Sequence, residues 1–378
     1  MRRLLSFVIF LLVFPLLGAP PAGAADDHPT APVCTGDGVS GNRVEVVYAY
    51  IDGSPNNEAT YALMINDWAA VMDWAFDASA ARQVTGASAH PRWLFTAGCG
   101  ALDIATVKLP SDPGGSFDAL VSDFDALGMM STDHHDRRYF TFVDDSSRTL
   151  ESTFLGDDNA YPANNASNGN AGSAPQVSYI GGNAWKGQDF NTYPLADYGT
   201  TWEDWGKQHE LMHTLGAVNA SAPHSYFGHV SDCYDAMCGK DTKVAQARCK
   251  DDASFDLFDC GADDYFAVRP ACRSYLATHW NTYNNSFLAR GDTEPLTCAI
   301  GGRTRTTDRT PTFKIAADRP ATFECKLDGR APEPCAGRFT TPKLRFGRHT
   351  LTAVATDQDG LTDSTPATLT FKVIRRRR

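Results

Sequence analysis

The chain has 378 residues and a formal net charge of −11 at pH 7. This length is enough for two domains of ~150 residues, each with its own core. An acidic surface repels phosphate backbones, so the charge argues against nucleic acid as a substrate or partner. The acidic excess lies in the first 303 residues, whereas the remainder is basic, as expected for two domains of different composition.

The first residues have the pattern of a secretory signal peptide. Arg2 and Arg3 form a basic start, residues 4–17 are almost entirely apolar, and small residues up to Ala24 supply a cleavage site. The apolar run is shorter than the ~20 residues that a membrane-spanning helix needs. We therefore expect residues 1–24 to be removed, and the mature protein to be secreted, extracellular and without a membrane span.

The ten cysteines all lie after the expected cleavage site. An even number of cysteines in an exported protein favours disulfides over thiolate metal sites. The sequence does not fix the pairing, and our hypothesis pairs neighbours along the chain: Cys34–Cys99, Cys233–Cys238, Cys249–Cys260, Cys272–Cys298 and Cys325–Cys335. A zinc site that includes Cys233 and Cys238 is the alternative.

The segment before residue 202 alternates between strand and helix patterns. β-Branched and aromatic residues predict strands at 43–51, 93–95, 104–109, 139–143 and 176–180. Apolar residues at helical spacing predict helices at 57–81 and 116–127, the second capped by Ser116, and the aromatic stripe of the first is interpreted as core. His134 and His135 are expected in a solvated loop. Together these elements predict an α/β (α+β) domain over residues 25–300.

A helix predicted at 202–215 holds the only dense cluster of catalytic residue types. His209 and His213 are four residues apart and therefore share one face of this helix. Two imidazoles on one face can bind one ion, and Glu210 at the edge of that face can act as a general base. Gly216 can end the helix in the left-handed conformation. Because the helical periodicity and the glycine accompany the motif, it predicts a zinc hydrolase rather than a chance His-Glu-x-x-His on a surface helix.

The residues that follow this helix narrow the class of hydrolase. No glutamate occurs between Glu210 and Glu294, which argues against a zinc peptidase whose third ligand is a downstream glutamate. His-Glu-x-x-His-x-x-Gly, followed by Met237 in Asp-Ala-Met-Cys, resembles the metzincins, a clan of secreted zinc endopeptidases. The resemblance implies Zn²⁺ as cofactor and places Met237 in a structural turn beneath the metal. Residues 200–290 are also similar to a group of exported actinobacterial metzincin-like proteins.

The third metal ligand departs from the family pattern. The position three residues after Gly216, where the family has a histidine, is Asn219. Two histidines just beyond can replace it. We favour His224 as a displaced third ligand because the preceding proline stiffens its approach. His229 is the alternative, since its distance to Met237 along the chain is similar to that in compact members of the clan.

The predicted activity is hydrolysis of peptide bonds in extracellular proteins. His209, His213 and His224 would hold Zn²⁺, and Glu210 would take a proton from water and return it to the leaving amine. Asn219 supports the alternative of a catalytically inactive protein that uses the same fold for adhesion, whereas the intact Glu210 favours the enzyme. Aspartates also crowd residues 251–264, and the sequence leaves Ca²⁺ binding open there beside a plainly solvated loop.

The C-terminal part has a different sequence pattern. Residues 301–310 are expected to form a linker, and 375–378 a basic tail. Short strands separated by turns predict an all-β sandwich, Ig-like or fibronectin III-like, at 311–374: residues 312–315, 322–327, 349–357 and 367–373. This domain has no catalytic cluster, so contact with cell-wall material or extracellular protein is its expected role.

Overall fold

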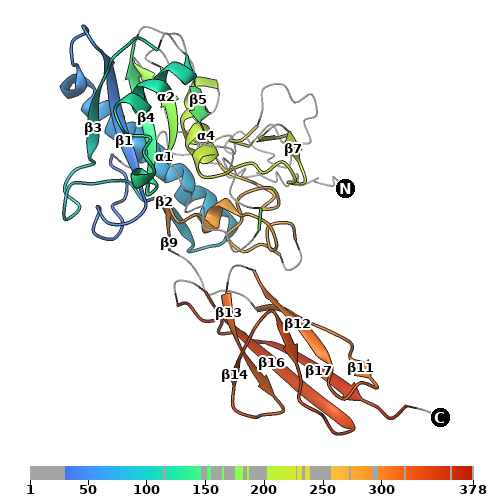
Figure 1. Ribbon diagram of the computed structural model, residues 1–378. Helices are drawn as coiled ribbons and strands as arrows, with labels where there is room; N and C mark the ends of the chain where they lie inside the picture. The colour runs from blue at the N-terminus through green and yellow to red at the C-terminus, as the bar shows by residue number, and fades with distance from the viewer. Residues whose placement is uncertain are drawn as a thin grey trace, which may run out of the picture.

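The structure is a computed structural model of the full chain (Figure 1). It describes residues 30–113, 116–145, 151–154, 164–165, 175–181, 185–186, 202–226, 228–231, 235–238, 257–271, 274–291, 297–318, 321–357 and 360–376. The expected signal peptide lies outside these residues. Within them, no helix is both long enough and apolar enough to cross a membrane.

A five-stranded sheet forms the centre of the α/β part, with the strand order β3-β1-β4-β6-β5. Its strands are β1 (Arg43–Ile51), β3 (Ile104–Leu109), β4 (Arg137–Asp144), β5 (Glu151–Phe154) and β6 (Gln176–Ile180). The first four in this order are parallel, whereas β5 runs antiparallel to β6 at the edge. Strands β1, β4 and β6 are buried along almost their whole length, as parallel strands covered on both faces are.

Helices cover both faces of this sheet. On one face lie α1 (Glu58–Gln83) and α4 (Trp202–Thr214), whose apolar side chains share one core with alternate residues of β1 and β4. On the other face, α2 (Phe117–Ala126) packs Leu120 and Phe124 against the remaining residues of these strands. Ser116 caps α2 as expected, since its side chain accepts a hydrogen bond from the Ala119 N–H at 3.3 Å. Trp68 is 1% exposed, so the aromatic stripe of α1 is core.

The prediction of a strand at residues 93–95 is wrong. The extended segment there is β2 (Ser88–Pro91), which pairs with β9 (Leu288–Gly291) near the end of the α/β part. Trp93 and Phe95 each form only an isolated bridge, to Val44 and Leu102. Their aromatic side chains are buried because they fill the core, and burial alone does not make a strand. The short helix η1 (Thr132–His134) places His134 and His135 at the surface, as expected.

Short elements follow α4. The hairpin strands β7 (Ser225–Tyr226) and β8 (His229–Val230) pair with each other, and the helical turn η4 (Thr282–Asn284) precedes β9. Asn285 lies directly after η4 and donates from Nδ2 to the Leu215 carbonyl at 2.8 Å. The return of the chain from η4 to β9 therefore contacts the end of α4.

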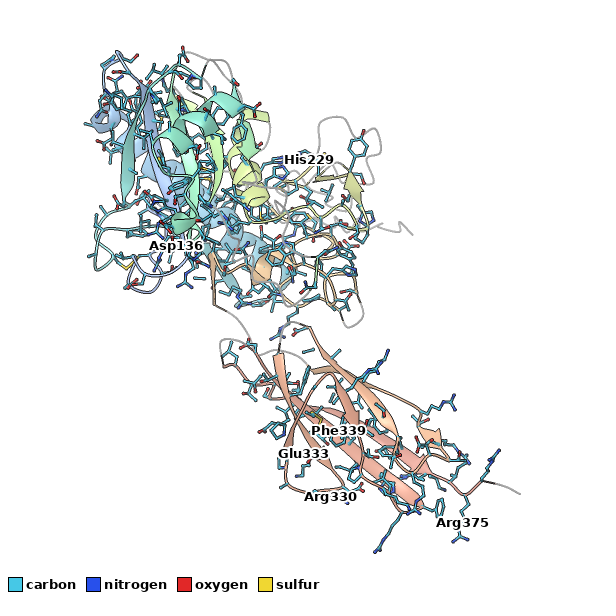
Figure 2. The ribbon with its side chains drawn as sticks, viewed as in Figure 1. Asp136, His229, Arg330, Glu333, Phe339 and Arg375 are labelled. Atoms are coloured by element: carbon cyan, nitrogen blue, oxygen red, sulfur yellow. A yellow bond between two sulfur atoms is a disulfide. The ribbon has the colours of Figure 1, made fainter. Side chains whose placement is uncertain are left out.

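The C-terminal strands form two facing sheets with a core of their own (Figure 1). One sheet has the order β10-β12-β15, and the other β11-β17-β16-β13-β14. The strands are β10 (Thr297–Gly301), β11 (Arg305–Thr306), β12 (Thr312–Ala317), β13 (Ala321–Leu327), β14 (Glu333–Cys335), β15 (Arg338–Thr340), β16 (Gly347–Asp357) and β17 (Ala367–Val373). Figure 2 shows Phe339 inside this unit and Arg375 at its outer end.

This β unit begins earlier than the sequence predicted. Residues 301–310 were expected to be a linker, yet β10 pairs with β12 and β11 pairs with β17. Ile300 lies in the core of the unit. The strand pattern is difficult to recognise in residues 301–310 because they are rich in threonine and arginine. Such polar residues are compatible with strands here, since both sheets expose one face to solvent.

Two of the expected disulfides are observed within the described residues. Cys34–Cys99 holds the N-terminal arm, and Cys325–Cys335 joins β13 to β14. Cys260 is also disulfide-bonded. The remaining expected pairs involve Cys233, Cys249 and Cys272, which lie outside the described residues.

Candidate metal centre

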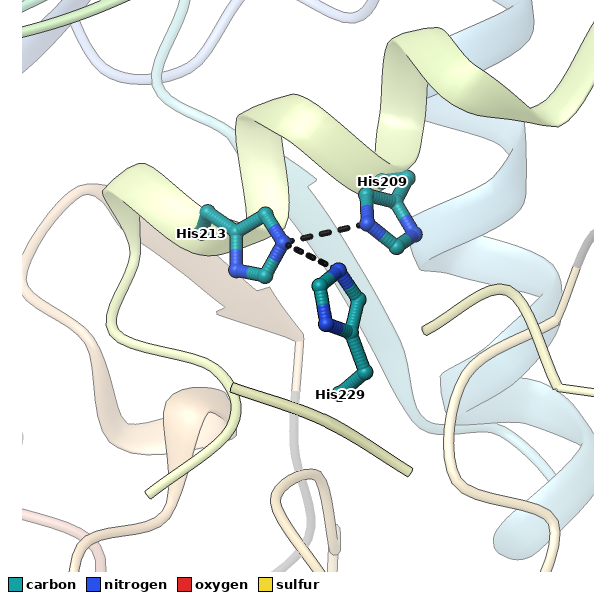
Figure 3. Close-up of side chains that lie close together, drawn as sticks. All are labelled: His209, His213 and His229. Carbon is teal, nitrogen blue, oxygen red and sulfur yellow. Dashed lines mark hydrogen bonds between the residues drawn. The ribbon is translucent and has the colours of Figure 1, made fainter. Parts of the chain in front are cut away.

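Three histidine side chains meet at the face of α4 (Figure 3). The Nε2 atom of His213 lies 3.0 Å from that of His209 and 3.3 Å from that of His229. These three residues each offer a ligand atom to a common point, and they form a group able to hold a metal ion. The two helical histidines are buried, whereas His229 is partly exposed.

The end of α4 orients His213. Gly216 has φ +87°, and the Ala217 N–H bonds back to the Met212 carbonyl at 3.1 Å. The Gly216 N–H bonds to the His213 carbonyl at 2.8 Å, which completes the Schellman pattern of helix termination that the glycine predicted. The same turn aims the Ala217 carbonyl at His213, whose Nδ1 donates to it at 2.8 Å. The helix stop therefore also fixes the direction of the ring.

A tight turn at residues 235–238 orients His209. Its Nδ1 donates to the Ala236 carbonyl at 2.7 Å. Met237 is fully buried, and its N–H bonds to the Asp235 side chain at 2.7 Å, while its carbonyl accepts from the Val230 N–H at 2.9 Å. The turn predicted from Met237 thus lies against the histidine cluster and is bonded to the strand that carries the third histidine.

The hairpin of β7 and β8 supplies His229. Tyr226 and His229 are opposite each other in the pairing register, and Gly228 has φ +83°. The Gly228 carbonyl accepts from the Val218 N–H at 3.2 Å, and this bond attaches the turn to the segment that follows α4. Backbone bonds to both neighbouring segments hold His229 at the cluster.

The electrostatics of the cluster favour a cation. Because Nδ1 of His209 and Nδ1 of His213 donate to carbonyls, the neutral rings turn the lone pairs of Nε2 toward each other. Burial, together with the neighbouring His229, lowers the pKa of His213 to about 4, and burial lowers the pKa of His209 well below its usual value. Three neutral nitrogens can share one ion. Ligands at ~2.05 Å from a tetrahedral Zn²⁺ lie about 3.3 Å apart, close to the observed separations.

Glu210 lies beside the cluster. It follows His209 directly on α4, and only 8% of it is exposed. Its charge contributes to the environment of Tyr179 on β6, whose pKa is raised to about 12 by burial, by Asp145 and by Glu210. Glu210 is not among the three residues grouped as ligands.

The structure places His224, the residue favoured from the sequence as third ligand, away from this cluster. Its Nδ1 lies 2.9 Å and 3.0 Å from the two carboxylate oxygens of Asp264. We favoured His224 because Pro223 stiffens the chain just before it. In the structure, however, His224 comes before β7, and the hairpin brings His229 to the helix instead. Of the two candidates, His229 is the one that the structure groups with His209 and His213.

Two polar residues that sequence reasoning missed hold the end of α4. Arg138 on β4 is fully buried, its Nε donates to the Thr214 carbonyl at 3.2 Å, and its guanidinium lies 4.0 Å from the centre of the Phe287 ring. Asn285 satisfies the next carbonyl, that of Leu215. A cation at the C-terminal end of a helix stabilises the helix dipole. Neither residue belongs to a recognisable motif, so the sequence carried no signal for this role.

Asp263 and Asp264, two of the aspartates considered for calcium, lie in one group with His224. Asp251, Asp252 and Asp256 lie outside the described residues. Asp259 is buried, and its carboxylate accepts hydrogen bonds from four backbone N–H groups, those of residues 263–266. These bonds occupy the Asp259 oxygens, so this residue stabilises a turn and is not placed as a calcium ligand.

No family model and no curated protein matches the chain. Among solved structures, the extracellular domain of a one component system from B. thetaiotaomicron is 16% identical over 19% of this chain and 11% of that chain, with a TM-score of 0.17. Fibronectin(III)-like modules of CbhA from Clostridium thermocellum are 18% identical over 20% of this chain and 94% of that chain, also at 0.17. Catalytically inactive OgpA from Akkermansia muciniphila, in complex with an O-glycopeptide substrate, is 9% identical over 93% of this chain and 98% of that chain, at 0.34. TM-scores this low assign neither a fold nor a function.

Proposed function

We propose that the chain is a secreted zinc-dependent endopeptidase in which His209, His213 and His229 hold the metal and Glu210 is the general base. The convergence of three Nε2 atoms at 3.0 and 3.3 Å, two of them with Nδ1 bonded to a backbone carbonyl, carries this proposal. Carbonyl partners of this kind orient zinc-ligating histidines in known sites and fix the tautomer that coordinates.

The residues of the chain divide the chemistry between them. A bound Zn²⁺ supplies a Lewis acid and lowers the pKa of water toward ~7. His209, His213 and His229 would hold the ion, and His229 is the one of the three that is partly exposed. Glu210 takes the proton of the attacking water and returns it to the nitrogen of the leaving amine. Met237 shapes the floor of the site from its fixed turn and takes no part in proton transfer.

The edge strand β5 offers a place for the substrate. It is the last strand of the sheet, it packs against α4, and among the described residues it pairs only with β6. An extended peptide can add to such an edge by main-chain hydrogen bonds. This arrangement would place a polypeptide beside the metal helix, which favours a peptide substrate over a small ester.

The alternative of an inactive binding protein rested on Asn219. With His229 proposed as third ligand, the ligand set no longer depends on that position. The intact Glu210 next to His209 also favours the enzyme, because a binding protein has no need of a general base at this position. We therefore keep the enzyme as the single proposal.

The test replaces Glu210 by glutamine, which keeps the shape and removes the base. Hydrolysis of a broad peptide mixture by Glu210→Gln should fall by at least ~10²-fold, as expected for loss of a general base, while zinc content stays at the wild-type level. Glu324→Gln, an exposed change on β13, is the matched control and should hydrolyse like wild type. Activity retained in Glu210→Gln, or no hydrolysis by zinc-loaded wild type, would exclude the proposed mechanism.

A further inference from the structure

A second group of metal-ligating side chains lies outside the histidine cluster. His224, Asp263 and Asp264 each offer one ligand atom, and these atoms all lie within 4.8 Å of one another. The imidazole Nδ1 is almost equidistant from both Asp264 oxygens, at 2.9 and 3.0 Å. One ion with ligand distances of ~2.0–2.4 Å spans separations of this size.

The two aspartates are presented by a turn that holds itself together. The buried Asp259 carboxylate accepts the backbone N–H groups of residues 263–266, and the Asp259 N–H bonds to the Tyr265 hydroxyl at 3.0 Å. The backbone of the turn is thus held by the Asp259 carboxylate. Only 7% of the Asp264 side chain is exposed, so a nearly buried carboxylate faces His224 and the second carboxylate.

We propose that His224, Asp263 and Asp264 form a second, structural site for a divalent transition-metal ion such as Zn²⁺. The mixed donor set decides the class of ion. Ca²⁺ takes oxygen ligands, whereas one imidazole with two carboxylates suits Zn²⁺ or a similar first-row ion. The partly exposed His224 leaves room for water to complete the coordination.

The site lies at the base of the hairpin that carries His229. The carbonyl of His224 accepts from the Ser231 N–H at 3.0 Å, and its own N–H donates to Asp264 at 2.8 Å. The first bond closes the hairpin below β7 and β8, and the second attaches the hairpin to the 259–266 turn. An ion held here would fix the start of the hairpin against the 259–266 turn, and so would hold His229 at the first cluster. This inference does not depend on peptidase activity.

The test counts ions in the purified full-length chain. Metal is removed with a chelator, Zn²⁺ is added back, excess is removed by gel filtration, and zinc per chain is measured by mass spectrometry. We expect two ions in wild type, one in His213→Ala, one in Asp263→Asn, and two in the control Asp133→Asn, an exposed aspartate on η1. The same protein titrated with Ca²⁺ should show no binding that competes with the second Zn²⁺.

The number of zinc ions per chain in His213→Ala decides whether the second site exists. No bound zinc in this variant, with one ion in wild type, would show that His224 and Asp264 form only an ion pair and would overturn the second site. Two ions retained in Asp263→Asn would overturn the ligand assignment. If either variant fails to fold by circular dichroism, Co²⁺ titration of wild type replaces it: two phases of visible absorption are expected, and a single phase overturns the proposal. Hydrolysis is not read in this experiment, so its outcome is separate from that of the peptidase proposal.

Discussion

Removing the imidazole of His229 should strongly weaken metal binding, because this ring supplies one of only three protein ligands in the proposed centre. The free energy of zinc binding in structural sites, about 10–16 kcal/mol over four ligands, corresponds to ~2.5–4 kcal/mol per ligand, or ~10²–10³-fold in the dissociation constant. His229→Ala should lose this factor together with hydrolysis. The Nε2 separation of 3.3 Å from His213 is the observation behind the expectation.

The loss of metal affinity in His229→Ala is to be compared with that in His224→Ala. His224 lies against Asp264, so its removal acts on the first cluster only through the base of the hairpin. Supporting residues of this kind change metal affinity by ~10–100-fold at most, and we expect a loss at the lower end of that range. The exposed His134→Ala serves as a control without effect.

The assay is competition between the metal-free protein and a fluorescent zinc chelator near neutral pH, at less than one zinc per chain so that the tighter site is read. The order of weakening should be His229→Ala first, then His224→Ala, then His134→Ala. If His224→Ala loses affinity and hydrolysis while His229→Ala keeps both, the third ligand is the one favoured from the sequence, and the reasoning from the structure is refuted.

Three further changes test other parts of the account. Gly216→Ala forces a side chain into the left-handed region at φ +87°, and unfolding measurements should show a loss of ~1–2 kcal/mol with weaker metal binding. Burial opposes protonation of His349, but its hydrogen bonds to Asp328 and to a backbone carbonyl raise its pKa, so stability of the β unit should be greatest below pH ~6.5 and fall as pH rises through the raised pKa. A thermal-melting series with His349→Gln should flatten that slope, and an unchanged slope would contradict the assignment. Replacing Cys325 and Cys335 by serine opens a loop with a sequence separation of 10 and should cost at most ~3 kcal/mol in unfolding of the β unit without reducing hydrolysis.

The regular elements were predictable where a single periodicity dominates. Strand β1 matches the expected 43–51, and α1 follows from apolar residues at helical spacing. Strand β5 gave no such signal, because a four-residue strand at the sheet edge is too short to show a pattern. Strand β2 ends in a proline and contains His90, so its pairing with β9 depends on contacts across the fold that the local sequence does not express.

The residues of the candidate site likewise differ in how far the sequence predicts their positions. His209, Glu210 and His213 are fixed relative to one another by one helix, and the spacing of residues on a helix is known from the sequence. The third histidine arrives on a hairpin whose strands have two residues each. Its position depends on bonds to the Met237 turn and to Val218, which come from tertiary structure. The sequence could therefore name His224 and His229 as candidates, but the choice between them needed the fold.

The most direct test of the metal centre is an anomalous-difference map from crystals of the zinc-loaded protein, with data collected on both sides of the zinc absorption edge. We expect a peak at ~2.0–2.1 Å from the Nε2 atoms of His209, His213 and His229 together, with Glu210 beside it and not among the ligands. A map with no peak among these three histidines, or with the peak bound by His224 in place of His229, would contradict the account.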